Sequence, residues 1–211
     1  MIADWLQWAQ RLQALAATGR YFGDSAFDHE RYEEMHEIAT AMLASLADQP
    51  IERVAGLLAN DEVGYVTPKI DVRVALIGTQ SYAGKILLVQ EKSDGRWTMP
   101  GGYADVGLSA GENAAKEFRE EAGVEVEITR LFCMRHKAKH AYRPDIRDFY
   151  KLFFLCECAD ISSLSGGLET SQAKFFPRAE LPPLSEGRII AKDVELAFEA
   201  HENPDMVMLF D

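Results

Sequence analysis

Cysteine is scarce in this chain, with three residues among 211, and the three form no CxxC spacing. Cys133, Cys156 and Cys158 lie in apolar segments that are typical of β-strands, so we interpret them as small buried hydrophobic residues. Their odd number and scattered positions argue against both a disulfide framework and a thiolate metal site.

Long hydrophobic runs are also missing. No apolar stretch approaches the roughly 20 residues that a membrane helix needs. Residues 1–19 lack the basic start, the continuous apolar stretch and the small-residue cleavage site of a secretory signal. We therefore expect a cytoplasmic protein that makes no membrane contact.

Positive charge is in short supply, since 22 Lys and Arg face 34 Asp and Glu and the net charge is −12. Such a chain repels a polyphosphate backbone, so nucleic acid is an unlikely partner. The segment 24–39 is acidic, which argues against a DNA-binding regulator. One local concentration of positive charge lies in residues 135–147.

Residues 1–63 show the periodicity of helices and are predicted to form an all-helical N-terminal domain. In the first helix, apolar residues recur at three- or four-residue spacing: Trp5, Trp8, Leu12, Leu15 and Ala16. A second helix is expected over residues 28–47, and Pro50 precedes a third that reaches Leu58. For the two tryptophans we favour core or interface packing over ligand stacking.

From residue 67 onward the pattern changes to strands. Apolar runs predict strands at 70–77, 86–89, 124–133 and 149–158, and a closing helix is expected over 187–201. The clearest loop is 161–167. The sequence therefore predicts a mixed α/β domain over 68–211, with the domain boundary between Asn60 and Pro68.

Three closely spaced acids, Glu117, Glu120 and Glu121, share one arc of a helix expected to start near Gly111. The helix alone favours a solvated acidic face. However, carboxylates in the last turns before Gly123 oppose the helix dipole, and like charges at this spacing repel one another. A bound divalent cation would remove both costs.

The spacing back to the preceding glycine pair resolves the two alternatives. Gly102, five residues, position 108, seven residues and then the segment 116–124, KEFREEAGV, keep register over 23 positions, and WTMPG precedes them. This stretch resembles the Nudix box, in which Gly is followed by Glu and then by Arg-Glu-hydrophobic-any-Glu-Glu-any-Gly-hydrophobic. Two positions depart from the pattern, because Leu108 replaces the first Glu and Lys116 replaces the Arg.

The resemblance implies an α/β fold, a Nudix-type α/β/α sandwich with a mixed sheet, here preceded by the small helical domain. It also implies hydrolysis of a nucleoside diphosphate linked to another moiety, with Mg²⁺ or Mn²⁺ as cofactor. Glu117 and Glu121 would be the principal metal ligands and Glu120 a supporting one. A backbone carbonyl of Gly101 or Gly102 would complete the set.

In the family the two replaced side chains commonly brace the loop against the helix. Here Leu108 is expected to brace by packing, and Lys116 to meet Glu112 or Glu120 one helical turn away. The metal ligands are retained, so the catalytic roles implied are those of Glu120 and Glu121. General-base duty must fall elsewhere, and Glu169, which precedes a strand, is our candidate; nearby Gln172 stands where some relatives have an acid.

The basic segment 135–147 is expected to bind an anionic part of the substrate. The residues predicted to contact the substrate are Arg135, Lys137, Lys139, His140 and Arg143. The alternative is a surface loop whose charge is incidental. Tyr142 would either stack on a base or pack locally.

The helical N-terminus, the WTMPGGYADVG segment, Leu108 and Lys116 together resemble a Nudix subgroup that includes CDP-choline pyrophosphatases. This subgroup implies a homodimer. The function expected first is cleavage of a CDP-choline-like pyrophosphate with release of a nucleoside monophosphate, and the alternative substrate is ADP-ribose. A non-catalytic module that senses a nucleotide is the alternative of another class, which the clustered glutamates disfavour.

Overall fold

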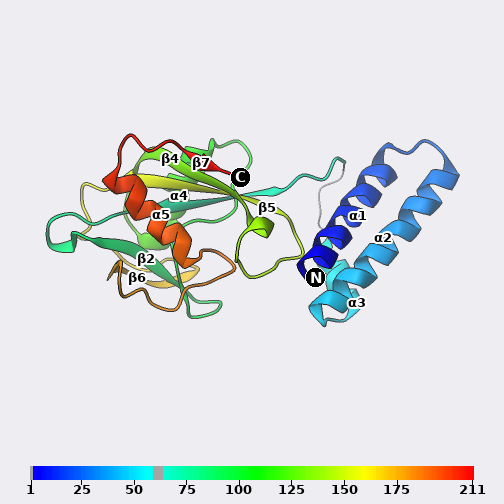
Figure 1. Cartoon of the computed structure of the whole chain (residues 1–211), viewed down its shortest axis with the longest axis horizontal. Helices are drawn as coiled ribbons and strands as arrows, with labels where there is room; N and C mark the ends of the chain where they lie inside the picture. Colours follow the sequence, from blue (N-terminus) through cyan, green and yellow to red (C-terminus); the bar gives the residue numbers. More distant parts are fainter. Residues whose placement is uncertain (1, 59–63) are drawn as a thin grey trace. The chain divides into compact units, whose positions relative to one another are not determined.

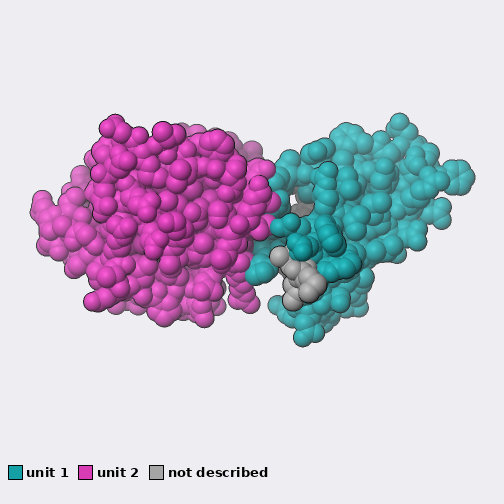
Figure 2. Space-filling model, in the orientation of Figure 1, with its two compact units in different colours: residues 1–68, 144–148 teal, residues 69–143, 149–211 magenta. Residues whose placement is uncertain are grey.

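The computed structural model describes residues 2–58 and 64–211, whose helices and strands are shown in Figure 1. The chain divides into two compact units (Figure 2): unit 1 comprises residues 1–68 and 144–148, and unit 2 comprises 69–143 and 149–211. The boundary predicted between Asn60 and Pro68 includes residues 60–63, which lie outside the described residues. The membership of 144–148 in unit 1 was not predicted.

Unit 1 contains the three predicted helices, α1 (Ile2–Phe22), α2 (Ala26–Ala47) and α3 (Ile51–Leu58). Helix α2 begins after Ser25, whose side chain accepts a hydrogen bond from the backbone N–H of Asp28, as a good N-cap residue does. It ends at Asp48 in the left-handed conformation.

The buried face of the helical unit differs from the expected one. Its core consists of Ala9, Leu43, Ala44, Val54 and Leu58. Trp5 and Trp8 are 52% and 55% exposed and contact each other edge to face, with ring centroids 5.0 Å apart. Within the described chain they are therefore not core residues, because the small side chain of Ala9 takes the inward position between the helices.

Unit 2 contains two sheets. A four-stranded mixed sheet has the order β1-β5-β4-β7, with β1 and β5 parallel and β4 antiparallel to β5, and a three-stranded antiparallel sheet has the order β3-β2-β6. The strands are β1 (Lys69–Ala75), β2 (Lys85–Glu91), β3 (Trp97–Thr98), β4 (Glu127–His136), β5 (Phe149–Glu157), β6 (Thr170–Pro177) and β7 (Leu209–Phe210).

Side chains alternate between two cores along the strands of unit 2, as the pleat of a strand requires. Val74 and Leu87 join a core with helix α4 (Ala110–Ala122), whereas their neighbours Ala75 and Leu88 join a core with helix α5 (Ala191–Glu202). The strands therefore lie between two helices, which confirms the predicted α/β/α architecture with a mixed sheet. Helix α5 begins four residues later than predicted, after Ile190.

Helix α4 has well-defined ends. At its start Ser109 and Glu112 form a reciprocal capping box, which satisfies two backbone N–H groups. At its end Gly123 adopts the left-handed conformation with φ of 76°. These two ends fix the rotation of the helix and hence the direction of its glutamates.

A buried ion network joins β1 to β5. The carboxylate of Asp71 accepts hydrogen bonds from the Arg73 guanidinium at 2.8 and 2.9 Å and from the Lys151 ammonium at 2.7 Å. All three side chains are nearly inaccessible to solvent. Burial alone would raise the pKa of Asp71, but the two cations hold it well below its usual range. No sequence pattern indicates that these charged strand residues face inward.

All three cysteines are free. Cys133 and Cys156 are buried as expected, whereas Cys158 is only partly buried. Among the described residues, no helix is both long enough and apolar enough to cross a membrane. Strand β4 extends to His136, so the segment 135–147 predicted as a loop begins inside a strand.

Candidate functional site

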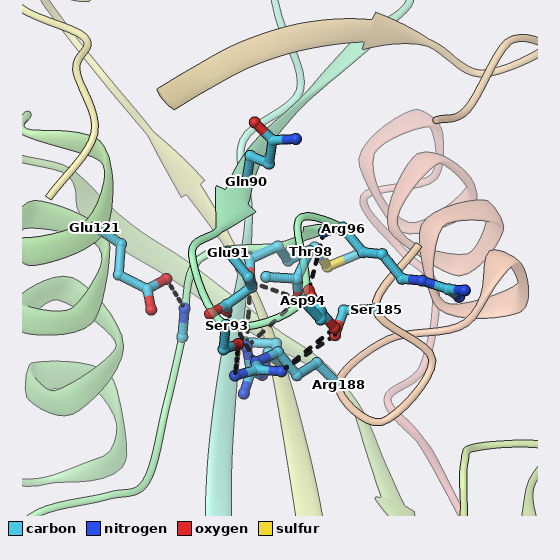
Figure 3. Close-up of polar contacts among 12 residues, drawn as sticks. Gln90, Glu91, Ser93, Asp94, Arg96, Thr98, Glu121, Ser185 and Arg188 are labelled. Carbon is cyan, nitrogen blue, oxygen red and sulfur yellow. Dashed lines mark hydrogen bonds and ion pairs between the residues drawn. The ribbon is translucent and has the colours of Figure 1, made fainter. Parts of the chain in front are cut away.

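Glu121 lies in the last turn of α4 and is 6% exposed. One carboxylate oxygen accepts a hydrogen bond from the backbone N–H of Gly101 at 2.9 Å (Figure 3). The backbone carbonyl of Glu121 accepts another from the Thr170 hydroxyl at 2.7 Å. Burial raises the pKa of Glu121 to about 7, although Arg73 and the Gly101 N–H oppose the rise.

The glycine pair before the helix is shaped by its approach to β1. Gly101 has φ of 148°, and a Cβ atom there would lie 2.0 Å from the Val72 carbonyl oxygen, so only glycine fits. The carbonyls of Pro100 and Gly102 accept hydrogen bonds from Val74 and Val72 of β1. Of the two candidate carbonyl ligands, Gly102 is thus already engaged, which leaves Gly101 as our prediction.

Glu117 lies one helical turn before Glu121 and faces the same glycine pair. A Cβ atom on Gly102 would lie 2.8 Å from one Glu117 carboxylate oxygen, so the missing side chain leaves room for the acid. Burial raises the pKa of Glu117, and Glu120 adds to the rise while Lys116 opposes it. Two partly or fully buried carboxylates therefore converge beside the glycine pair.

Glu120 points elsewhere. Its carboxylate lies 3.0 Å from the Lys116 ammonium, which also lies 3.1 Å from Asp105 and 3.8 Å from Glu117. Of the two partners expected for Lys116, the structure shows Glu120, whereas Glu112 belongs to the capping box. Asp105 was missed, since nothing in the spacing relates it to Lys116.

These groups suit a divalent metal. Carboxylate and backbone carbonyl oxygens are the ligands that Mg²⁺ and Mn²⁺ prefer, and a bound cation would offset the cost of burying Glu117 and Glu121. Within residues 2–58 and 64–211, no three or more acidic, His or Cys side chains already converge as a complete ligand set. The assignment of Glu117, Glu120 and Glu121 as ligands stays a prediction.

A second buried acid, Glu91 at the end of β2, was not predicted. Its carboxylate lies 2.9 Å from the Arg188 guanidinium, which also donates a hydrogen bond to the Ser185 hydroxyl oxygen at 3.1 Å. Figure 3 shows this network beside Glu121. Burial raises the pKa of Glu91, and Arg188 and Arg73 oppose the rise. Glu91 and Arg188 lie far apart in the sequence, so no local pattern signals their pairing.

The basic segment uses much of its charge within unit 2. The Arg135 guanidinium lies 2.6 Å from the buried Asp193 carboxylate, which also accepts a hydrogen bond from the Tyr142 hydroxyl. Lys137 is buried with its ammonium 4.8 Å from the Phe149 ring centroid. Tyr142 therefore packs locally, the second of its two predicted roles.

The remaining predicted substrate contacts are nearer the surface. The His140 ring lies 2.7 Å from the Asp211 carboxylate. Lys139 and Arg143 have exposed side chains. Glu169, the candidate general base, is exposed directly before β6, and its charge contributes to the raised pKa of Glu91 after the larger effect of burial.

Comparison with known protein families gives two matches. Residues 3–58 match the family described as a UDP-X-like, N-terminal oligomerisation domain. Residues 67–196 match the NUDIX domain, which covers more than half of the chain.

Individual relatives cover most of the chain. A Bacillus subtilis protein named "Putative ADP-ribose pyrophosphatase YjhB" is 38% identical over 98% of this chain and 97% of its own length. A crystal structure of a UDP-X diphosphatase is 30% identical with a TM-score of 0.62, covering 100% of this chain and 99% of that one. An ADP-ribose pyrophosphatase structure from Streptococcus suis is 37% identical with a TM-score of 0.61, covering 69% of this chain and 100% of that one.

The raised pKa of Glu121 predicts a pH-dependent stability in metal-free protein. Because the folded carboxylate binds its proton up to a pH of about 7 rather than its ordinary 4.5, its stabilising contribution is complete below pH 4.5 and is lost as the pH rises to about 7. The Glu121→Gln variant has no carboxylate at this position and therefore does not lose this contribution. In EDTA, the melting temperature of the variant minus that of the wild type should be larger at pH 8 than at pH 5.

Glu120→Gln is the matched control, because Glu120 lies on the same turn but is half exposed. The melting-temperature difference between Glu121→Gln and wild type should change more with pH than the difference between this control and wild type. An equal difference for Glu121→Gln at pH 5 and pH 8 would contradict the burial of an ionised carboxylate at this position.

Proposed function

Because the chain belongs to the Nudix hydrolase family, we propose that it is a divalent-metal-dependent pyrophosphohydrolase acting on a nucleoside diphosphate joined to a second moiety, with release of a nucleoside monophosphate. The observation that supports this proposal best is the pair of carboxylates, Glu117 and Glu121, that converge beside the glycine pair. A non-catalytic nucleotide sensor has no need of two buried acids at this position.

The chain's own residues prepare the site in three ways. The Gly101 N–H fixes one carboxylate oxygen of Glu121, and the Thr170 hydroxyl anchors the backbone of the same residue. Glu117 and Glu121 would hold the metal with the Gly101 carbonyl, and Glu120 would join them. When bound, Mg²⁺ or Mn²⁺ neutralises phosphate charge and activates a water. Glu169 is our candidate to accept the proton of that water.

The relatives guide the choice of substrate. Full-length relatives carry the names ADP-ribose pyrophosphatase and UDP-X diphosphatase, whereas the sequence placed CDP-choline first. We therefore propose ADP-ribose and UDP-linked compounds as the first substrates to test, with CDP-choline beside them. All three share a nucleoside diphosphate whose pyrophosphate joins a second group.

The exposed cations Lys139 and Arg143 are proposed to bind the anionic end of the substrate. Both belong to the segment that separates β4 from β5, and both side chains are exposed. Arg135 and Lys137 are buried instead, so we propose that they hold this segment in place rather than contact the substrate.

We also propose a homodimer formed through unit 1. The matched N-terminal family is described as an oligomerisation domain, and α1 exposes Trp5, Trp8 and Leu15 at helical spacing. Exposed tryptophans at this spacing are typical of a protein–protein interface.

Removing either paired carboxylate should abolish turnover while the fold is retained. Glu117→Gln and Glu121→Gln are expected to lower kcat by orders of magnitude, because each removes a proposed metal ligand. The measurement is nucleoside monophosphate release from ADP-ribose, a UDP-sugar and CDP-choline with Mg²⁺ or Mn²⁺. Unchanged turnover in both variants would refute the metal site, and nucleotide binding without turnover by wild type would favour the sensor.

The Glu169→Gln substitution tests whether Glu169 acts as the general base rather than as a metal ligand. It should lower kcat while Mn²⁺ binding stays at the wild-type level, because a base acts on the water rather than on the metal. Wild-type kcat in this variant would eliminate Glu169 as the base.

Lys139→Ala should raise KM more than it lowers kcat, since it removes a contact made equally in the ground and transition states. Lys192→Ala is the control, because Lys192 is an exposed lysine on α5 that pairs with Glu195. An effect of Lys139→Ala confined to kcat would contradict the anion-binding role.

The double substitution of Trp5 and Trp8 to alanine should convert the dimer to a monomer, because it removes the largest exposed apolar side chains of α1. Light scattering after size-exclusion chromatography measures the mass. Leu168→Ala is the control, since Leu168 is 90% exposed in unit 2. A wild-type monomer, or a double variant that stays dimeric, would contradict this interface.

A further inference from the structure

Lys116 is the cation shared by three carboxylates at the edge of the candidate site. Its ammonium lies 3.0 Å from Glu120, 3.1 Å from Asp105 and 3.8 Å from Glu117. The lysine side chain is 28% exposed, so solvent screens these contacts only in part. A single positive charge is therefore shared by two acids of the helix and one acid of the preceding loop.

The contacts of Lys116 divide the glutamates of α4 into two groups. Glu121 is fixed on the Gly101 N–H, and Glu117 faces Gly102. Glu120 is turned to Lys116 instead. A divalent cation that recruits Glu120 must therefore take this carboxylate from the ammonium, because two cations that share one carboxylate repel each other.

Asp105 offers Lys116 a partner that does not depend on Glu120. The loop around Asp105 is held by the fully buried Asn113, whose side-chain oxygen accepts a hydrogen bond from the Asp105 N–H at 2.8 Å. The Asn113 amide also donates to the carbonyls of Asp105 and Leu108. These bonds fix the backbone of Asp105, and its carboxylate contacts Lys116 at 3.1 Å through an interaction in which Glu120 takes no part.

We propose that Lys116 is an internal counter-cation that competes with the divalent metal for Glu117 and Glu120, and that Asp105 holds the ammonium when the metal is bound. This inference deepens the proposed function and rests on its metal site. In this chain Lys116 and Asp105 would together set the metal affinity. Position 108 carries a leucine rather than an acid, and the loop acid that contacts the lysine is Asp105.

The two residues should affect metal binding in opposite directions. Lys116→Gln removes the competitor and should tighten Mn²⁺ binding roughly two- to fivefold, the size expected for a partly exposed ion pair. Asp105→Asn removes the alternative partner of the ammonium and should weaken binding by a similar factor. Free Mn²⁺ is measured by electron paramagnetic resonance on the full chain without nucleotide.

A purely structural role of Lys116 predicts a different result. If the lysine only braced the loop against α4, both variants would weaken Mn²⁺ binding and lower the melting temperature, and this result would overturn the proposal. Lys192→Gln makes the same change in net charge on α5, where Lys192 pairs with Glu195 and Glu199. An equal tightening in this control would overturn the proposal as well, since it would assign the effect to net charge.

The readout also separates this inference from the proposed function. Opposite shifts in a chain that hydrolyses no nucleotide would support the role of Lys116 while refuting the activity. Mn²⁺ binding that neither variant changes would refute the role of Lys116 alone. A wild-type chain that binds no Mn²⁺ would refute both the metal site and its competitor.

Discussion

The carboxylate of Asp71 is buried between two buried cations, and the geometry of the site depends on this arrangement. Asp71 is paired in register with Lys151 of the parallel neighbour β5 and accepts a hydrogen bond from its ammonium. The Asp71 carboxylate also accepts hydrogen bonds from the Arg73 guanidinium, two residues along β1. Arg73 in turn donates to the Met99 carbonyl, directly before Pro100 and the glycine pair. The register of the sheet and the path of the glycine segment are thus tied to one anion.

The same network carries one more positive than negative charge, and the nearby acids compensate for it. Burial would lower the pKa of Arg73, but Asp71 first and then Glu121 and Glu91 hold it above its usual value. Burying charges is costly unless they are paired and hydrogen-bonded. Arg73 and the site carboxylates therefore reduce each other's burial cost, and a divalent ion would shift that balance further toward ionised acids.

Local patterns predicted the helices and the long strands, but not the two-residue strands β3 and β7. The family resemblance implied Glu117, Glu120 and Glu121 as ligands; the structure places Glu117 and Glu121 beside the glycine pair and turns Glu120 to Lys116. The apolar stripe of α4 includes Phe118, which is fully buried and fixes the side on which Glu117 and Glu121 emerge. Pairings between distant segments were not predictable. Arg135 was expected to contact substrate because it lies in a basic segment. Its partner Asp193 is remote in sequence, and a periodic pattern records which face is apolar but not what covers it.

The burial of charged residues within β1 is a second feature that no local pattern indicates. Alternation along β1 placed Asp71 and Arg73 opposite the apolar residues, where solvent is the usual neighbour, yet both are buried. In α1 the apolar face is wider than the hairpin covers, so the small side chains of Ala9 and Ala16 point inward and the tryptophans remain outside. The helical periodicity of α1 shows which residues are apolar, but it does not show which of them pack against α2 and α3.

The short segment 144–148 belongs to a different compact unit from the residues on either side of it. It belongs to unit 1, whereas Arg143 and Phe149 on either side belong to unit 2, so the polypeptide passes from one unit to the other three times. Ile146 packs against the helical core, and Gln10 of α1 donates to the Asp145 carbonyl at 2.9 Å. A cut at residue 68 would separate residues 144–148 from the rest of unit 1. Recombination that exchanged the helical module alone would leave Ile146 without its apolar neighbours.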